Sequence, residues 1–219
     1  MQTLKEQTSA QVENTRKVKP EYIQALDDLI ALETVYEKRE NALSIADTAP
    51  NFQLSNIDGA KVSLEKLLEK GPIILSFYRG SWCPYCNLEL KALQAEIPEF
   101  NALGAQLVTI SPEITDESLS AEEKEKLDFF VLSDQDSNIA FKYGVIWKVP
   151  EFILEHMKKD RGLDLAVINN AKGNILPIPS TFIISKEGLI SWKYTSIDFR
   201  TRAEPEDIIL ALKKLKEDL

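Results

Sequence analysis

The sequence contains very little cysteine and almost no histidine. Its 219 residues include two cysteines and a single histidine, His156. Two cysteines cannot build the disulfide framework of a small secreted domain. Together with one histidine they also supply too few of the usual ligands for four-coordinate zinc, so we expect no metal site.

Long apolar runs and an excess of basic residues are also missing. No stretch approaches 18 consecutive apolar residues, so we expect no membrane-spanning helix. The first 20 residues lack the apolar segment of a secretory leader, which makes a cytoplasmic location the expectation. The net charge is −9, whereas nucleic acids and anionic membrane surfaces favour basic proteins. We therefore expect neither as a partner.

The two cysteines that are present form a Cys-x-x-Cys pair, Cys83 and Cys86, directly after the apolar run 73–78. A strand, a tight Arg-Gly-Ser turn and a new helix are expected in that order. Residues i and i+3 share one face of a helix, so the two sulfurs can meet. Unpaired N–H groups at a helix N-terminus stabilise a thiolate, and such sites lower a thiol pKa from about 8.5 to roughly 3.5–7.5. The pattern predicts a redox-active dithiol.

The chain divides into an N-terminal extension, residues 1–45, and a main domain, residues 46–219. Residues 1–19 are polar and lack periodicity, so we expect them to fray. From Pro20, apolar residues recur at helical spacing and predict an amphipathic helix over 20–42. Its apolar stripe either packs on its own domain or forms a contact in a homodimer, and the sequence does not separate the two.

In the main domain, predicted strands alternate with predicted helices and a hairpin and a helix follow. This order indicates a mixed sheet with helices on both faces. Residues 145–177 are less regular, and we interpret them as an insertion with one helix. The predicted strands are 51–54, 73–78, 106–110, 129–132, 181–184 and 190–194, and the predicted helices are 64–69, 83–97, 117–127, 137–143, 150–160 and 204–216.

An ordered set of short segments carries a family resemblance over about 170 residues. The chain resembles the alkyl hydroperoxide reductase/thiol-specific antioxidant family, in its peroxiredoxin-like branch. The resemblance implies a thioredoxin-like α/β fold, a central mixed β-sheet flanked by helices on both faces. The segments are Ala-Pro-Asn-Phe at 49–52, Ile-Leu-Ser-Phe-Tyr-Arg-Gly at 74–80, Trp-Cys-Pro-Tyr-Cys at 82–86, 104–112, Leu-Ser-Asp at 132–134, Tyr-Gly-Val at 143–145 and Pro-Ser-Thr-Phe-Ile-Ile at 179–184.

The resemblance gives the two cysteines two alternative roles. In peroxiredoxins the attacking cysteine is three residues before a glutamate, which matches Cys86 and Glu89. In thioredoxins and glutaredoxins the first cysteine attacks, which matches Cys83, with Cys86 resolving. We expect Cys83 to be the more exposed thiol because it starts the helix. With either assignment, a sulfenic acid on one sulfur condenses with the other thiol, which gives a Cys83–Cys86 disulfide.

Two positions depart from the peroxiredoxin pattern. Arg79 replaces the proline that begins the usual motif, and Pro179 replaces the arginine that holds thiolate and peroxide. We hypothesise that Arg79 supplies the missing charge; a solvated turn arginine is the alternative. Pro179 resembles the proline of thioredoxins that lies against the dithiol, so we expect a cis Ile178–Pro179 bond, with a trans strand-starting proline as the alternative. Thr181 follows in that strand as a further supporting residue.

Four other side chains are candidates near the dithiol. Trp82 is expected to shield it, with core packing as the alternative. Tyr78 and Tyr85 each carry a hydroxyl able to donate a hydrogen bond to the site. His156 lies in the insertion, where we expect a solvated helix histidine rather than a proton shuttle.

Together these features predict a thiol-dependent reductase of hydrogen peroxide and organic hydroperoxides. Thioredoxin or a glutaredoxin-type reductant would restore the dithiol, and no cofactor is needed because the sulfurs carry the electrons. Two alternatives stay open. One is a thioredoxin- or glutaredoxin-like disulfide reductase, which the Cys-Pro-Tyr-Cys sequence and Pro179 favour. The other is a non-enzymatic redox-sensing interaction protein.

Overall fold

A seven-stranded mixed sheet forms the centre of the computed structural model, which describes residues 2–35, 42–114, 128–169 and 174–217. Its strand order is β2-β1-β5-β4-β3-β8-β9. Strands β3, β4 and β5 are parallel, whereas β1, β8 and β9 each run antiparallel to a neighbour. The strands are β1 (Gln53–Asn56), β2 (Lys61–Ser63), β3 (Ile73–Phe77), β4 (Gln106–Ser111), β5 (Phe130–Ser133), β8 (Ser180–Ile184) and β9 (Ile190–Thr195).

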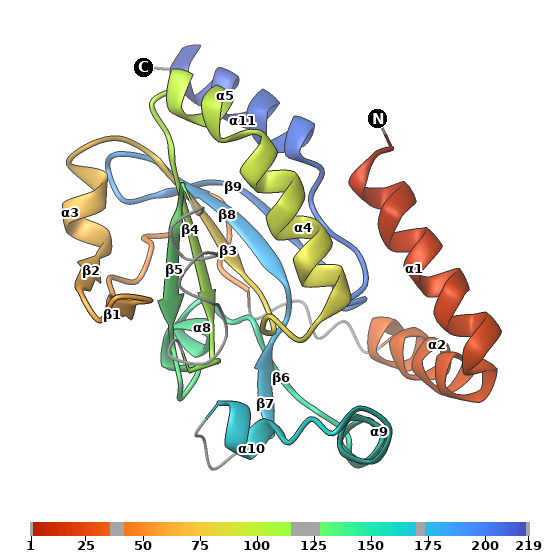
Figure 1. Cartoon of the computed structure of the whole chain (residues 1–219). Coiled ribbons are helices and arrows are strands. Elements are labelled where there is room, and N and C mark those ends of the chain that lie inside the picture. The colour runs from red at the N-terminus through yellow and green to blue at the C-terminus, as the bar shows by residue number, and fades with distance from the viewer. Residues whose placement is uncertain (1, 36–41, 115–127, 170–173, 218–219) are drawn as a thin grey trace.

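Helices cover both faces of this sheet, as the fold class predicted (Figure 1). Every residue of β3 is buried, and alternate side chains point to opposite faces. Ile73, Leu75 and Phe77 pack with α3 (Leu64–Leu68) and α8 (Asn138–Lys142). Ile74 packs on the other face with α4 (Pro84–Ala95), α5 (Ile97–Ala102) and α11 (Pro205–Glu217). The helix predicted at 117–127 lies outside the described residues.

The N-terminal extension is a pair of helices, α1 (Leu4–Val18) and α2 (Pro20–Val35), here called the N-terminal hairpin. The prediction that residues 1–19 fray is wrong, because α1 is fixed at its start. Thr3 and Glu6 form a reciprocal capping box. The N–H groups of Leu4 and Lys5 also donate to the carboxylate of Glu204, just before α11, at 3.1 and 2.5 Å.

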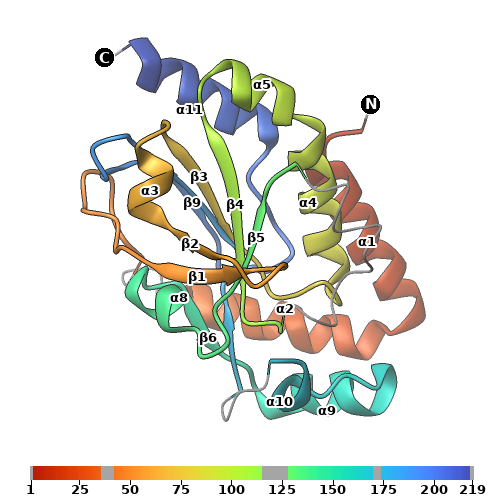
Figure 2. The same ribbon diagram turned by 60° about the vertical axis from the view of Figure 1, so that its left-hand side comes forward.

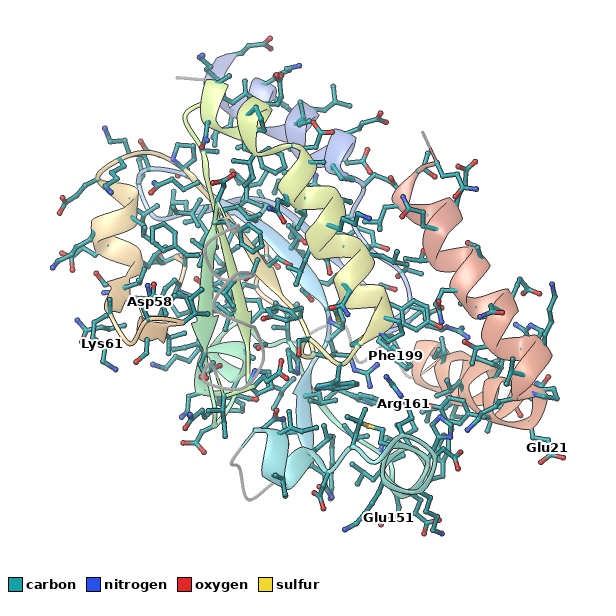
Figure 3. All side chains as sticks on the ribbon, in the orientation of Figure 1. Glu21, Asp58, Lys61, Glu151, Arg161 and Phe199 are labelled. Carbon is teal, nitrogen blue, oxygen red and sulfur yellow. The ribbon has the colours of Figure 1, made fainter. Side chains whose placement is uncertain are left out.

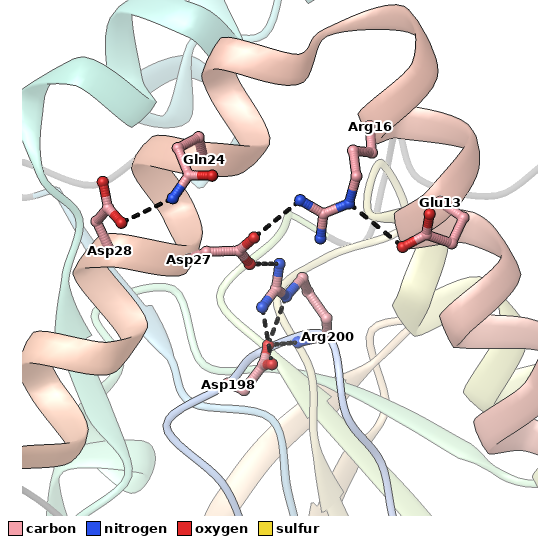
Figure 4. Close-up of polar contacts among 7 residues, drawn as sticks. All are labelled: Glu13, Arg16, Gln24, Asp27, Asp28, Asp198 and Arg200. Carbon is pink, nitrogen blue, oxygen red and sulfur yellow. Dashed lines mark hydrogen bonds and ion pairs between the residues drawn. The ribbon is translucent and has the colours of Figure 1, made fainter.

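A chain of charged side chains joins α1, α2 and the loop after β9 (Figure 4). Arg16 of α1 donates to Asp27 of α2 at 3.0 Å, and Asp27 accepts from Arg200 at 2.7 Å. Arg200 in turn pairs with Asp198. Ile23 and Leu26 of the apolar stripe of α2 are buried in one cluster with residues of the main domain, which is the first of the two alternatives given for the stripe.

The insertion at 145–177 is more regular than expected. It holds β6 (Ile146–Lys148), α9 (Glu151–Arg161), α10 (Leu165–Ile168) and β7 (Ile175–Pro177), with β6 and β7 paired antiparallel. Figures 1 and 2 show α1 alongside α4, and α2 between α1 and α9. The N-terminal hairpin and α9 thus close over the start of α4. No helix in the described part of the chain is long and apolar enough to cross a membrane.

Candidate functional site

The dithiol lies at the start of α4, where the strand-turn-helix pattern placed it. Cys83 is the N-cap of the helix and Pro84 is its first residue, where a missing N–H costs nothing. Cys83 was expected to be the more exposed thiol; it is the one that lines a cavity, but both are buried, Cys83 at 1% and Cys86 at 0% exposed. Ile23 of α2 and Met157 of α9 belong to the same buried cluster and cover the sulfurs.

The surroundings treat the two thiols unequally and favour the thiolate on Cys83. Burial alone would raise the pKa of Cys83, but a hydrogen bond from Cys86 and the positive charges of Arg79 and Arg202 outweigh it. The pKa of Cys83 is therefore well below its ordinary value. Burial, together with the hydrogen bond given to Cys83, raises the pKa of Cys86 well above its ordinary value.

Arg202 is a site residue that the sequence analysis missed. Its Nη2 donates to Cys86 Sγ at 3.1 Å, and its Nε donates to the buried carboxylate of Glu89. Ser76 Oγ of β3 also donates to Glu89, at 3.3 Å. Glu89 lies one helical turn after Cys86, and a buried glutamate requires a cationic partner. This requirement is the signal in the sequence that a residue such as Arg202 must be present. Nothing in the sequence indicates which of the 26 lysines and arginines supplies it.

Arg79 is buried, so the alternative of a solvated turn arginine is wrong. It is 4% exposed, and its guanidinium lies 5.0 Å from the ring centre of Trp82 and 4.2 Å from that of Phe199. Its Nε is buried without a hydrogen-bond partner among the described residues. Gly80 makes room for the indole, since a Cβ there would lie 2.4 Å from Trp82 Nε1.

Thr181 belongs to β8 and Pro179 directly precedes that strand. The expected cis Ile178–Pro179 bond is wrong, because the described residues contain no cis peptide. Pro179 is instead a buried trans proline before the strand. Thr181 is buried and pairs with Ser76 across β8 and β3, next to the serine that supports Glu89.

A cavity of about 450 Å³ opens beside Cys83, between the N-terminal hairpin, α9 and the turn that carries the dithiol. Its size falls in the range of small-molecule sites. Figure 3 shows Phe199 and Arg161 between α2, α4 and α9. The apolar lining side chains include Val18, Ile23, Leu26, Trp82, Met157 and Phe199, and the cationic ones are Lys19, Arg79 and Arg161.

His156 forms part of this cavity wall, so the expectation of a solvated histidine is wrong. Its ring stacks on Tyr22 at 3.7 Å, and its Nδ1 lies 2.6 Å from Asp160. Burial lowers the pKa of His156 more than Asp160 raises it, which favours the neutral ring. The hydroxyls of the two candidate tyrosines bond elsewhere, Tyr78 to Ser111 and Tyr85 to Thr15 of α1, although both rings pack in the buried cluster that holds the cysteines. Among the described residues, no group of three or more His, Cys, Asp or Glu side chains could hold a metal ion.

A family model and several known proteins match this chain. The model of the AhpC/TSA family matches residues 45–193. A putative peroxiredoxin bcp of Helicobacter pylori strain J99 is 28% identical over 162 residues, which cover 74% of this chain and 94% of that protein. The thiol-disulfide oxidoreductase ResA of Bacillus cereus is 28% identical over 121 residues, covering 55% of this chain and 69% of that protein.

Solved structures share the fold. Peroxidoxin BcpB of Mycobacterium tuberculosis has a TM-score of 0.60 at 22% identity, over 78% of this chain and 97% of that one. A peroxiredoxin-like protein of Aquifex aeolicus has a TM-score of 0.58 at 16% identity, over 80% of this chain and 88% of that one. The N-terminal hairpin and Arg202 both lie outside the segment that the family model matches. The chain belongs to the AhpC/TSA family and is a peroxiredoxin-type enzyme.

Proposed function

We propose that the protein reduces hydroperoxides through a cycle in which Cys83 attacks and Cys86 resolves. The observation that carries the proposal is the unequal treatment of the two sulfurs. Cys83 lines the cavity, and the hydrogen bond from Cys86 and the charges of Arg79 and Arg202 lower its pKa, whereas burial raises the pKa of Cys86. A thiolate is the reactive form, and a neighbouring thiol is the partner that a sulfenic acid requires. Residues 46–219 form the catalytic domain in this proposal, and residues 1–45 the extension.

The chemistry needs no group beyond the two sulfurs. The Cys83 thiolate attacks the outer oxygen of ROOH, the O–O bond breaks, and the released RO⁻ takes a proton and leaves as ROH. Cys83 keeps the transferred oxygen as a sulfenic acid. The Cys86 sulfur then attacks the Cys83 sulfur, the S–O bond breaks, and water leaves. The two sulfurs have together supplied two electrons and are joined in a Cys83–Cys86 disulfide.

The supporting residues act on charge and position. Arg79 faces the cavity and takes the role of the arginine that Pro179 replaces, stabilising the thiolate and the departing oxygen. Arg202 holds Cys86 in place from the opposite side, and Glu89 orients Arg202. Trp82 holds Arg79 and shields the dithiol.

An external thiol must return the disulfide to the dithiol form. A reductant of thioredoxin or glutaredoxin type is the class that the family membership suggests. A cycle that depends on such reductants fits the reducing conditions of the cytoplasm.

The test follows the mass and the rate of the reduced protein and its Cys83→Ser and Cys86→Ser variants with hydrogen peroxide. We expect the wild type to lose two hydrogens quickly and the Cys86→Ser variant to gain one oxygen. The Cys83→Ser variant should react no faster than a free thiol. Trapping of the oxygen in the Cys83→Ser variant instead would make Cys86 the attacking residue, and slow reaction in all three would refute the peroxidase.

Disulfide reduction is the second candidate, and the match to a thiol-disulfide oxidoreductase favours it. In that reaction the Cys83 thiolate attacks a foreign disulfide and Cys86 then releases the product. Reduction of a model protein disulfide at a rate that exceeds peroxide reduction would make it the main activity.

A further inference from the structure

Access to Cys83 limits which molecule can restore the oxidised enzyme. The attacking thiolate must reach a disulfide sulfur directly. Cys83 is 1% exposed, and the cavity beside it is walled by α1, α2 and α9. The N-terminal hairpin is fixed to the body by the Arg16–Asp27–Arg200 chain and by Glu204. A small thiol fits a cavity of about 450 Å³. A folded protein must instead bring its cysteine past the walls that α1, α2 and α9 form around the buried Cys83.

The charges around the cavity point to an anionic ligand. Lys19 is neutralised by Asp160, which lies 2.7 Å from it and also accepts from His156. Arg161 donates to the backbone oxygen of Trp82 at 2.8 Å, and no carboxylate pairs with it in the described part of the chain. Arg79 likewise has no acidic partner within the described ranges. Two guanidinium groups therefore face the cavity without a carboxylate.

Oxidation of the dithiol leaves this positive charge uncompensated. In the reduced protein the Cys83 thiolate balances Arg79, because the two groups interact electrostatically. Formation of the disulfide removes the thiolate, while Arg79 stays buried between two aromatic rings. A buried charge without a partner is costly, so an incoming anion stabilises the oxidised form. By linkage, that anion binds the oxidised protein more tightly than the reduced one.

We infer that the direct reductant of the Cys83–Cys86 disulfide is a small thiol bearing a carboxylate, bound in the cavity under the N-terminal hairpin, in place of the thioredoxin- or glutaredoxin-type protein that family membership suggests. This rests on the proposed function. The thiolate of the first molecule, drawn to Arg79, attacks Cys83 Sγ, the S–S bond breaks, and Cys86 leaves as a thiolate that takes a proton. A second thiol attacks the first molecule's sulfur, which releases a small disulfide and restores the Cys83 thiolate. Arg161 pairs with the carboxylate.

The binding test uses S-methylglutathione, an unreactive molecule with two carboxylates, titrated calorimetrically into oxidised and reduced protein. We expect about tenfold tighter binding to the oxidised form, within the usual range of coupling between sites. The Arg161→Gln variant should lose most of this affinity. The control Lys61→Gln, at an exposed lysine far from the cavity in Figure 3, should keep it. Equal binding to both redox states, or an unchanged Arg161→Gln variant, would overturn the inference.

The kinetic test compares thiols of different charge and size on the oxidised wild-type protein. At equal thiolate concentration, glutathione should reduce the disulfide at least about tenfold faster than cysteamine, which carries an ammonium group instead of carboxylates. Thioredoxin should be slower than glutathione. A faster reaction with thioredoxin, or an equal one with cysteamine, contradicts the inference. Peroxide oxidation of the reduced protein is measured separately, so fast oxidation with no glutathione preference refutes this inference and leaves the proposed function intact.

Discussion

Two buried arginines flank the dithiol, and their surroundings differ sharply. Arg202, on the interior side, donates to Cys86, to Glu89 and to the backbone oxygens of Phe199 and Thr201. Arg79, on the cavity side, is held by aromatic rings, and its Nε has no partner among the described residues. The difference teaches that an arginine held by several hydrogen-bond acceptors fixes the scaffold, whereas an arginine without them is available to interact with substrate.

Removal of Arg202 should have the largest effect, and mainly on stability. In an Arg202→Met variant, Glu89 would remain buried without its ion-pair partner, which typically costs about 3–5 kcal/mol. Chemical denaturation measures the loss. The double variant Arg202→Met/Glu89→Leu is the control, since it removes both charges and should recover most of the stability. No recovery would mean that Arg202 acts through its contact with Cys86 instead.

Removal of Arg79 should act on the reaction rather than on the fold. We expect an Arg79→Met variant to lose roughly 100-fold in the rate of peroxide reduction, as for the loss of one charge-stabilising donor. The pKa of Cys83, followed by thiolate absorbance, should rise because a stabilising positive charge is gone. If the unfolding free energy fell as far as in Arg202→Met while the rate held, the contrast between the two arginines would be wrong.

Gly80→Ala probes how Trp82 holds Arg79. The new Cβ would lie 2.4 Å from Trp82 Nε1, at a backbone φ of +144° that non-glycine residues rarely adopt. A destabilisation of about 1–3 kcal/mol follows from displacement of the indole and from the strained backbone. Gly59→Ala is the matched control, because φ is +79° there and nothing lies within 4 Å. Thermal unfolding of the two variants should show Gly80→Ala to be the more damaging.

Asp27→Asn should give the smallest loss of stability, and that loss should depend on pH. Burial raises the pKa of Asp27, but Arg200 and Arg16 outweigh burial and hold it below its usual value. A carboxyl whose pKa is lowered by folding stabilises the protein at pH values above its pKa in the unfolded chain, about 3.9. This stabilisation is lost as the pH falls through its pKa in the folded protein. We expect the free energy of unfolding of the variant to be about 0.5–1 kcal/mol below that of the wild type at neutral pH, and we expect this difference to vanish in acid.

Hydrogen exchange of the α1 amides measures the local part of this effect. Faster exchange confined to α1 would support the role of Asp27 in fixing the N-terminal hairpin. An unchanged exchange rate would show that Glu204 alone holds it.

The elements with local signals were predictable from the sequence. The apolar run 73–78 gave β3 to within one residue, and Pro84 gave the start of α4. Long-range features were not. Helix α1 is polar and depends on Glu204 for its anchor, and Arg202 is distant in sequence from the cysteine it touches. The burial of both cysteines was not predictable, because the sequence near Cys83 does not reveal that α2 and α9 pack beside it.

The anchor between Leu4 and Glu204 joins positions 200 residues apart, and this has a consequence for how the protein is made. The N-terminal hairpin leaves the ribosome well before Arg200 and Glu204, the residues that hold it in place, are synthesised. The sheet can fold while α1 and α2 are still undocked, because contacts of high sequence separation form late. The nascent enzyme therefore has an accessible dithiol before it has a cavity, and Cys83 is most open to the wrong thiols during synthesis.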